Sequence, residues 1–278
     1  MFYKNARIFC PDYQFRMGAF EVKDGLFGAV LPEAVPADAI DLQGATVIPG
    51  LIAVPSHGAM GADFSDGDYE GLKAMAAYYA SVGVTSFAPA SMTLPYEVLE
   101  KAFANARRLA DEQPEKLSVL RGIQMEGPYF SYKKRGAQNP DYLKQPDFEG
   151  FKALYDGCGG LIRIVDIAPE RPVAVEFVEQ AKELCTVSIA HTDSDYDHAK
   201  AACDAGDPPD PPVQCHARHF PPRPRCYPGC CGERTCAGRA DLRRSARPSR
   251  RCPSCLYHVQ GPDGSGVRLR PLLRHARG

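Results

Sequence analysis

Apolar and polar positions change their spacing repeatedly between residues 47 and 205. Compact apolar runs, typical of buried strands, alternate with segments in which apolar residues recur every three or four positions, as on one face of a helix. The runs predict strands at 47–54, 83–89, 117–126, 161–168 and 186–192. The helical spacing predicts helices at 68–81, 96–111, 148–155, 173–185 and 195–205. Strands and helices that alternate in this way build a parallel sheet with right-handed crossovers.

The predicted fold class is therefore α/β, with a partial (β/α)8 TIM-like barrel of about five βα units over residues 49–206. Before it, residues 1–48 hold short apolar segments separated by Pro, Asp and Gly turns, which predicts a small N-terminal β-sandwich segment. After it, residues 207–278 form an aberrant tail rich in Arg, Pro and Cys, which we expect to be irregular or disordered.

Composition sharpens the boundary at residue 206. The chain has 278 residues and a net charge of −1, but residues 207–278 carry 14 Arg and no Lys against 5 Asp and Glu. The tail is thus +9, and residues 1–206 carry −10. The tail also holds 7 of the 11 Cys and 12 of the 25 Pro. A shift this abrupt marks a domain boundary, a disordered tail or another break in the chain.

The remaining composition argues for an ordinary globular protein. A hydrophobic fraction of 44% supports a sizeable core, and no apolar run reaches the length of a membrane span. The start, Met1 to Asn5, lacks the basic-then-apolar pattern of a signal peptide. We therefore expect a cytoplasmic protein with no membrane partner and no disulfide framework.

Three possible metal ligands follow predicted strands: His57, Glu126 and His191. The ends of parallel strands meet at one face of a barrel, and imidazole and carboxylate groups there suit Zn²⁺ or a similar ion. Such a metal activates water for attack on an amide or ester carbonyl. Each residue has a structural alternative: His57 in a loop, His191 as a core histidine, and Glu126 as a cap on a strand that Gly127 and Pro128 end.

The loop after Glu126 adds a second signal. The basic run Lys133 to Arg135 leads into a glycine turn, Gly136 to Pro140. A carboxylate followed by a basic loop suits a metal beside an anionic substrate.

These motifs resemble a known family. The segment 47–58 is similar to the opening of the amidohydrolase superfamily, P-G-hydrophobic-I-D-x-H-x-H-G. Met-Glu-Gly-Pro at 125–128, with 134–140 and 189–192, resembles one branch, the N-acetylglucosamine-6-phosphate deacetylases. The resemblance covers residues 1–206 in order and spacing.

The resemblance implies roles for individual residues. Glu126 and His191 match metal ligands, and His57 matches the second His of the opening motif. Ala137, Gln138 and Asn139 match the loop that contacts the sugar, although many relatives carry His at the position of Gln138. The Asp and first His of the opening motif fall on Ala53 and Pro55. That loss indicates a one-metal site, or two single-base errors in the sequence.

The implied activity is hydrolysis of the N-acetyl amide of N-acetylglucosamine 6-phosphate to acetate and glucosamine 6-phosphate. The implied cofactor is a divalent metal ion, zinc first, with iron, manganese or cobalt as alternatives. The implied partner is the amino-sugar phosphate, with no nucleic acid, and full-length relatives are expected to be homo-oligomers.

After Gly206 the resemblance predicts a strand reading T-H-L-F-N-A-M, which supplies the third metal-binding His. The stretch Asp207 to Ala217 can be encoded by DNA that reads T-H-L-T-H-L-F-N-A-M when shifted by one base. We therefore expect a frameshift near Gly206. The general-base Asp of the family is then not encoded in this chain, and we expect the chain as written to be inactive.

The alternative interpretation is that the tail is a genuine part of the protein. Residues 207–278 would then make a non-enzymatic, basic, Cys-rich protein that binds zinc or nucleic acid. Cys252 and Cys255 form a C-x2-C pair, and the other possible ligands are Cys226, Cys230, Cys231, Cys236, His216 and His219. Their spacing matches no regular zinc finger, and aromatic residues for base stacking are few.

Overall fold

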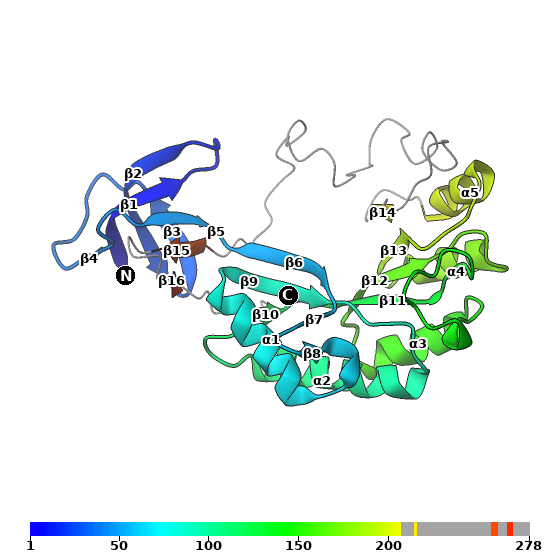
Figure 1. Cartoon of the computed structure of the whole chain (residues 1–278). Helices are drawn as coiled ribbons and strands as arrows, with labels where there is room; N and C mark the ends of the chain where they lie inside the picture. The colour runs from blue at the N-terminus through cyan, green and yellow to red at the C-terminus, as the bar shows by residue number, and fades with distance from the viewer. Residues whose placement is uncertain (207–213, 216–256, 261–265, 269–278) are drawn as a thin grey trace.

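The computed structural model of the chain describes residues 1–206, 214–215, 257–260 and 266–268. An N-terminal β-sheet lies at one end of the molecule, and parallel strands covered by helices form the rest (Figure 1). The architecture is mixed α/β with parallel sheets, as the sequence predicts.

The N-terminal sheet is built from β1 to β5, in the order β3-β2-β1-β5, with β4 beside β1. The bounds are Phe2–Phe9, Phe15–Lys23, Leu26–Val30, Ile40–Asp41 and Thr46–Pro49. Tyr3, Ala6 and Ile8 of β1 are buried, and Tyr3, Ile8, Phe20 and Val47 belong to a small core of this sheet alone. The described strands form one hydrogen-bonded sheet, so the two-layer sandwich stays a prediction.

Six further strands of the body run parallel, in two sheets. The first has the order β10-β9-β6, from Val119–Leu120, Val84–Pro89 and Leu51–Ser56. The second begins β11-β12-β13, from Ile123–Tyr129, Ile162–Ile167 and Thr186–Ile189. A parallel bridge between Ala90 and Gln124 joins the two sheets. The strand ends that carry the candidate ligands therefore point the same way.

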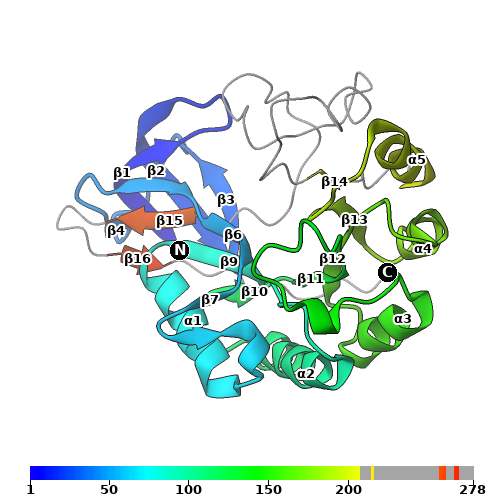
Figure 2. The same ribbon diagram turned by 45° about the vertical axis from the view of Figure 1, so that its right-hand side comes forward.

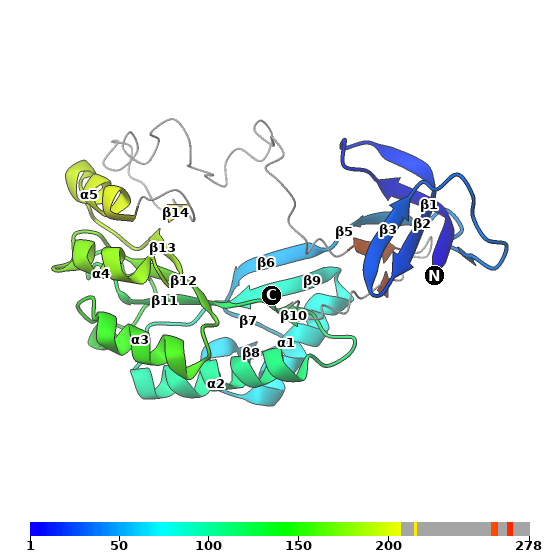
Figure 3. The ribbon, with the colours of Figure 1, turned by 180° about the vertical axis from the view of Figure 1, so that it is seen from behind.

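Five α-helices follow one another along the outer side of these strands (Figure 2). Figure 3 shows α1, α2 and α3 side by side from behind. Their bounds are Tyr69–Ser81, Tyr96–Glu112, Phe148–Gly157, Ala174–Ala181 and Tyr196–Gly206. All five predicted helices are confirmed. Each helix has buried residues on one side, such as Leu99, Phe103 and Leu109 in α2.

Local sequence explains where these helices begin. The Asp68 side chain accepts from the main-chain N–H groups of Glu70 and Gly71 at the start of α1. Asp147 does the same for Gly150 in α3. The large core beneath the helices includes Phe87, Met125 and Phe177, all fully or almost fully buried. Short elements complete this part: β7 Gly58–Ala59, β8 Ala62–Asp63, and 3-10 helices at Phe64–Asp66 and Pro140–Tyr142.

Pro55 lies inside β6, where a proline cannot donate to a strand ladder. The structure accommodates it in two ways. The register of β6 against β9 shifts between Ala53 and Ser56, so Pro55 lies in an irregular stretch. Among the described strands β6 is also an edge strand, which is where proline is tolerated.

Three predicted strands have wrong boundaries. The predicted strand 47–54 is divided between β5 of the N-terminal sheet and β6 of the body. The predicted strand 117–126 is split into β10 and β11, and β11 continues through Gly127 and Pro128 to Tyr129. The register against β12 shifts between Met125 and Tyr129, and pairing of Tyr129 with Ile167 then resumes. The Gly-Pro pair therefore bends the strand rather than ending it, because a register shift absorbs the irregularity. Similarly, β13 ends at Ile189, so His191 lies beyond the strand.

The prediction of an irregular tail is wrong for three short stretches. β14, Gln214–Cys215, adds a parallel strand beside β13. β15, Tyr257–Gln260, pairs antiparallel with β5, and β16, Gly266–Arg268, pairs with β15. The Cys and His residues of the alternative zinc module lie outside the described residues. Apart from the three short stretches, the other residues of the segment 207–278, to which the frameshift hypothesis refers, also lie outside the described residues. None of the described helices is long and apolar enough to cross a membrane.

Candidate metal centre

The three predicted ligands meet in the structure. The Glu126 carboxylate lies between two imidazoles, with His191 Nε2 3.1 Å from Oε1 and His57 Nε2 3.2 Å from Oε2. The Glu126 side chain is 13% exposed, against 39% for His57. Glu126 lies within β11, His57 directly follows β6, and His191 follows β13. One site shared by the three residues therefore explains their positions better than a separate structural role for each of them.

Main-chain carbonyls hold both imidazoles from behind. His57 Nδ1 lies 3.2 Å from the Ala90 oxygen, and His191 Nδ1 lies 3.0 Å from the Lys134 oxygen. A carbonyl can only accept, so each Nδ1 carries a proton. Each Nε2 then carries either a second proton, which it donates to Glu126, or a lone pair directed at a cation. Metal-binding histidines are commonly oriented by such a carbonyl.

His191 is further fixed by its backbone and its neighbours. Its φ is 48°, a left-handed conformation that is uncommon for a residue other than Gly. The Phe130 ring lies against the imidazole, with centroids 4.4 Å apart. Gly136 approaches from the basic loop, where a Cβ would lie 3.4 Å from His191 Cε1. Sequence reasoning did not identify Phe130 as part of the site.

The charges of these groups are coupled. Burial raises the pKa of Glu126, but the hydrogen bonds from His191 and His57 outweigh it and lower the value to about 2. The hydrogen bond to Glu126 raises the pKa of each histidine above its ordinary value, against the effect of burial. Without a metal, the site therefore favours a carboxylate held by protonated imidazoles.

The predicted sugar-contacting residues have different situations. Ala137 is exposed, and Asn139 is exposed but uses its side chain to accept from the Asp141 N–H, 3.0 Å away. Gln138 is only 4% exposed and donates to Glu126. In the basic run, Lys133 and Lys134 lie 3.3 and 3.9 Å from Asp193, so part of their charge is balanced.

A second acidic group lies beneath the site. Asp166, on β12, is fully buried, and its Oδ2 accepts from Gln124 Nε2 at 2.6 Å. Burial raises the pKa of Asp166 to about 7, despite this hydrogen bond. The sequence signal for Asp166 is an acidic residue inside an apolar strand. The predicted ligands were chosen at strand ends, so Asp166 was missed.

The donor set fits a divalent ion in its chemistry. Two imidazole nitrogens and one carboxylate, each imidazole oriented by a carbonyl, are typical zinc ligands. Among the described residues, however, no three acidic, His or Cys side chains converge on one point as a formed cage would. The two imidazoles contact opposite oxygens of Glu126. The described residues thus supply suitable ligand groups, but these groups are not arranged around one point.

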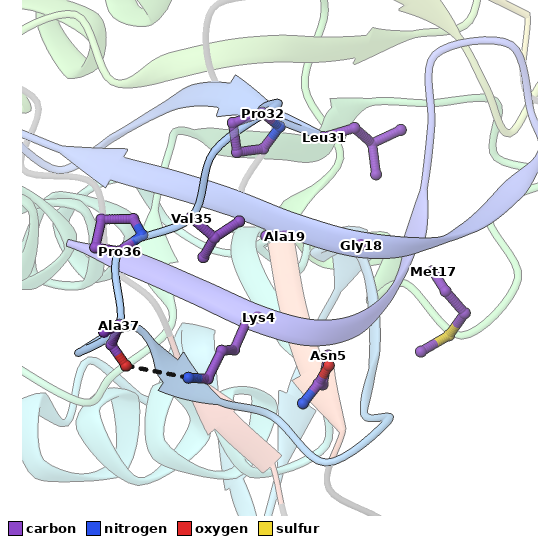
Figure 4. Close-up of a pocket in the computed structure, with 10 residues that line it drawn as sticks. All are labelled: Lys4, Asn5, Met17, Gly18, Ala19, Leu31, Pro32, Val35, Pro36 and Ala37. Atoms are coloured by element: carbon purple, nitrogen blue, oxygen red, sulfur yellow. Dashed lines mark hydrogen bonds between the residues drawn. The ribbon is translucent and has the colours of Figure 1, made fainter.

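A separate hollow lies in the N-terminal sheet, away from these ligands. It has a volume of about 540 Å³ and is lined by β1, β2 and the segment 31–37 (Figure 4). Lys4 projects along it and donates to the Ala37 oxygen. No His, Cys, Asp or Glu side chain lines it, so the site described above remains the candidate.

Comparison with known proteins finds relatives of similar sequence. N-acetylglucosamine-6-phosphate deacetylase of Bacillus subtilis is 34% identical over 174 residues, which is 62% of this chain and 42% of the relative. The chain resembles the N-acetylglucosamine-6-phosphate deacetylases. The enzyme of Vibrio furnissii is 30% identical over 61% of this chain and 43% of its own length. The chain thus spans less than half the length of these two deacetylases. No family model matches it.

The fold gives the same result. The crystal structure of N-acetyl-D-glucosamine-6-phosphate deacetylase from Mycobacterium smegmatis superposes with a TM-score of 0.67 at 25% identity, over 78% of this chain and 56% of the deacetylase. A mutant of that deacetylase, solved in complex with N-acetyl-D-glucosamine-6-phosphate, also has a TM-score of 0.67, at 26% identity, over 78% of this chain and 55% of the mutant.

Proposed function

We propose that residues 49–206 carry the metal-binding part of an N-acetylglucosamine-6-phosphate deacetylase. The observation that carries the proposal is the Glu126 carboxylate between the Nε2 atoms of His57 and His191, with both Nδ1 atoms held by carbonyls. The identity of the relatives supports the choice of reaction and substrate.

The proposal includes the fold of the site. Strands β6, β9, β11, β12 and β13, each followed by a helix, form the first five units of an interrupted (β/α)8 barrel. The N-terminal sheet is one part of a β-sandwich, and residues 207–278 result from out-of-frame translation. The parallel order of the strands and the outer row of helices support the barrel.

The protein residues have distinct tasks in this proposal. Glu126 and His191 hold the metal, and His57 stands as a further ligand. When bound, a divalent ion such as Zn²⁺ supplies a Lewis acid and lowers the pKa of a coordinated water. The third His and the general-base Asp of the family are not among the described residues. Lys134 fixes His191 through its carbonyl, and the exposed Ala137 and Asn139 remain proposed contacts for the sugar.

We further propose that the partner is the amino-sugar phosphate, that the protein is cytoplasmic and that the full-length protein forms a homo-oligomer. The names of the relatives favour a hydrolase over the zinc or nucleic-acid-binding alternative for residues 207–278. Salt-sensitive RNA binding that is lost on deletion of residues 207–278 would restore that alternative.

Acetate release from N-acetylglucosamine 6-phosphate tests the function. We expect the chain as written to bind Zn²⁺ through Glu126 and to release no acetate. A gene shifted by one base after codon 206 should give a product that does release acetate, and Glu126→Gln should abolish that release. If the shifted product shows no turnover that depends on Glu126, the proposed function is wrong. Turnover by the chain as written would overturn its inactivity alone.

A further inference from the structure

Gln138 is the least exposed residue of the loop between Ser131 and Pro140. Only 4% of its surface reaches solvent. Both ends of its amide contact protein atoms: Oε1 accepts from the Thr93 N–H at 2.7 Å, and Nε2 lies 3.1 Å from Glu126 Oε1. Nε2 also lies 3.9 Å from the sulfur of Met92. A side chain in this position has no free end to offer a sugar.

The orientation of the amide follows from its partners. The main-chain N–H of Thr93 can only donate, so the amide oxygen must face it. The NH₂ group then faces Glu126, where it donates to a carboxylate. A hydrogen bond to a charged acceptor is stronger than one between neutral groups.

Gln138 shares its acceptor with a histidine. Oε1 of Glu126 contacts both Gln138 Nε2 and His191 Nε2, each at 3.1 Å. Gln138 therefore holds the same carboxylate oxygen that the candidate ligand His191 contacts, and it does so from a buried position fixed by Thr93.

We propose that Gln138 is a positioning residue for Glu126, rather than a contact for the substrate. It fixes the plane of the carboxylate through the rigid main chain of Thr93, and so prepares the ligand for the metal. The inference rests on the metal centre of the proposed function. Outer-shell partners of this kind change metal affinity by about 10–100-fold.

Zinc affinity, measured by competition with a chromogenic chelator, tests the assignment on the full chain. Gln138→Met keeps an unbranched side chain but removes the donor, and we expect it to weaken Zn²⁺ binding by about 10–100-fold. Gln138→His restores an N–H donor and should recover part of the loss. Gln145→Met is the matched control, since Gln145 is exposed in the same region, and should bind as the parent chain does.

The outcomes separate this inference from the proposed function. If Glu126→Gln abolishes Zn²⁺ binding while Gln138→Met leaves it unchanged, the positioning role is wrong and the metal centre stands. If Glu126→Gln leaves binding unchanged, both are wrong. In the active product of the gene shifted by one base after codon 206, a higher KM for the sugar phosphate with unchanged zinc affinity in Gln138→Met would make Gln138 a substrate contact and overturn the inference.

A measurement on the unsubstituted chain covers the case in which Gln138→Met fails to fold. The side-chain amide of Gln138 should show slow exchange with solvent by NMR and should shift when Zn²⁺ is added. Fast exchange, or no shift on metal binding, would overturn the positioning role.

Discussion

The carbonyl oxygen of Lys134 lies 3.0 Å from Nδ1 of His191. This contact joins the basic loop to a candidate metal ligand through the main chain rather than through a charged side chain. The lysine's own ammonium group points to Asp193, 3.9 Å away. Lys134 therefore orients the imidazole whatever its side chain does, and replacing that side chain should disturb the zinc site little.

Zinc binding should weaken as pH falls. The pKa of both His57 and His191 is raised above 6.5 by Glu126, so protons compete with the metal already at pH values above 6.5. We expect the apparent Zn²⁺ affinity to fall steadily from pH 8 to pH 5, by titration calorimetry in buffers of different ionisation heat. His198→Asn removes an exposed histidine outside the site and should leave this profile unchanged. A pH-independent affinity would contradict the assignment of the ligands.

In the metal-free chain, Glu126, His57 and His191 should instead stabilise the folded state, by an amount that depends on pH. The pKa of Glu126 is lowered to about 2, so its contribution to stability is present above 4.5 and is lost as pH falls through about 2. The raised pKa of each histidine gives a contribution that is present below 6.5 and is lost as pH rises through the raised value. Glu126→Gln should therefore cost most near pH 5.5, on the order of 1–3 kcal/mol.

Urea unfolding with excess chelator measures that cost. The difference between the parent chain and Glu126→Gln should shrink at pH 3 and again at pH 9. A difference that stays constant from pH 3 to pH 9 would mean that Glu126 contributes by packing and not by charge.

Asp166→Asn should stabilise the chain at high pH. The pKa of Asp166 is raised to about 7 by burial, so the folded state resists its ionisation. The free energy of unfolding therefore declines as pH rises from the ordinary pKa of 3.8 to about 7, and Asn avoids this decline. We expect a gain on the order of a few kcal/mol at pH 8 and little change at pH 4.

Asp156→Asn is the comparison for that substitution, because Asp156 is exposed and lies beside Lys152. Its effect should be under about 1 kcal/mol at either pH. Equal effects of the two substitutions at pH 8 would show that the burial of Asp166 carries no penalty.

Gly127→Ala should destabilise the site severely. Gly127 has a φ of 91°, and a Cβ there would lie 2.1 Å from Thr93 Oγ1. Strain in the backbone and displacement of Thr93 should together cost at least about 2 kcal/mol. Gly157→Ala is the matched control, since Gly157 ends α3 and a Cβ there meets nothing within 4 Å. Guanidinium unfolding should give a neutral or slightly positive effect for it.

The sequence predicted the regular parts of the molecule because their periods are local. All five helices were found from apolar stripes such as Leu72, Met75 and Tyr79 in α1. The meeting of His57, Glu126 and His191 followed from the geometry of parallel strands. The end of β11 was missed because pairing of Tyr129 with Ile167, far away in the chain, outweighs the local effect of Gly127 and Pro128.

The orienting groups of the site could not be read from the sequence. The partners of the two imidazoles are main-chain oxygens of Ala90 and Lys134, which have no side-chain signature. The burial of Gln138 depends on Thr93, which comes from a different loop. The resemblance assigned Gln138 to the loop that it implies contacts the sugar, but position alone does not tell which way an amide faces.

Among the described strands β6 lies at a sheet edge, and this position should affect how the chain behaves in concentrated solution. Its first residues, Leu51 and Ile52, are 53% and 65% exposed, beside main-chain groups on the side away from β9. An apolar strand edge of this kind is a template for pairing with another chain. Newly made protein would therefore tend to self-associate and to be held by chaperones, and its yield would be limited by aggregation rather than by synthesis.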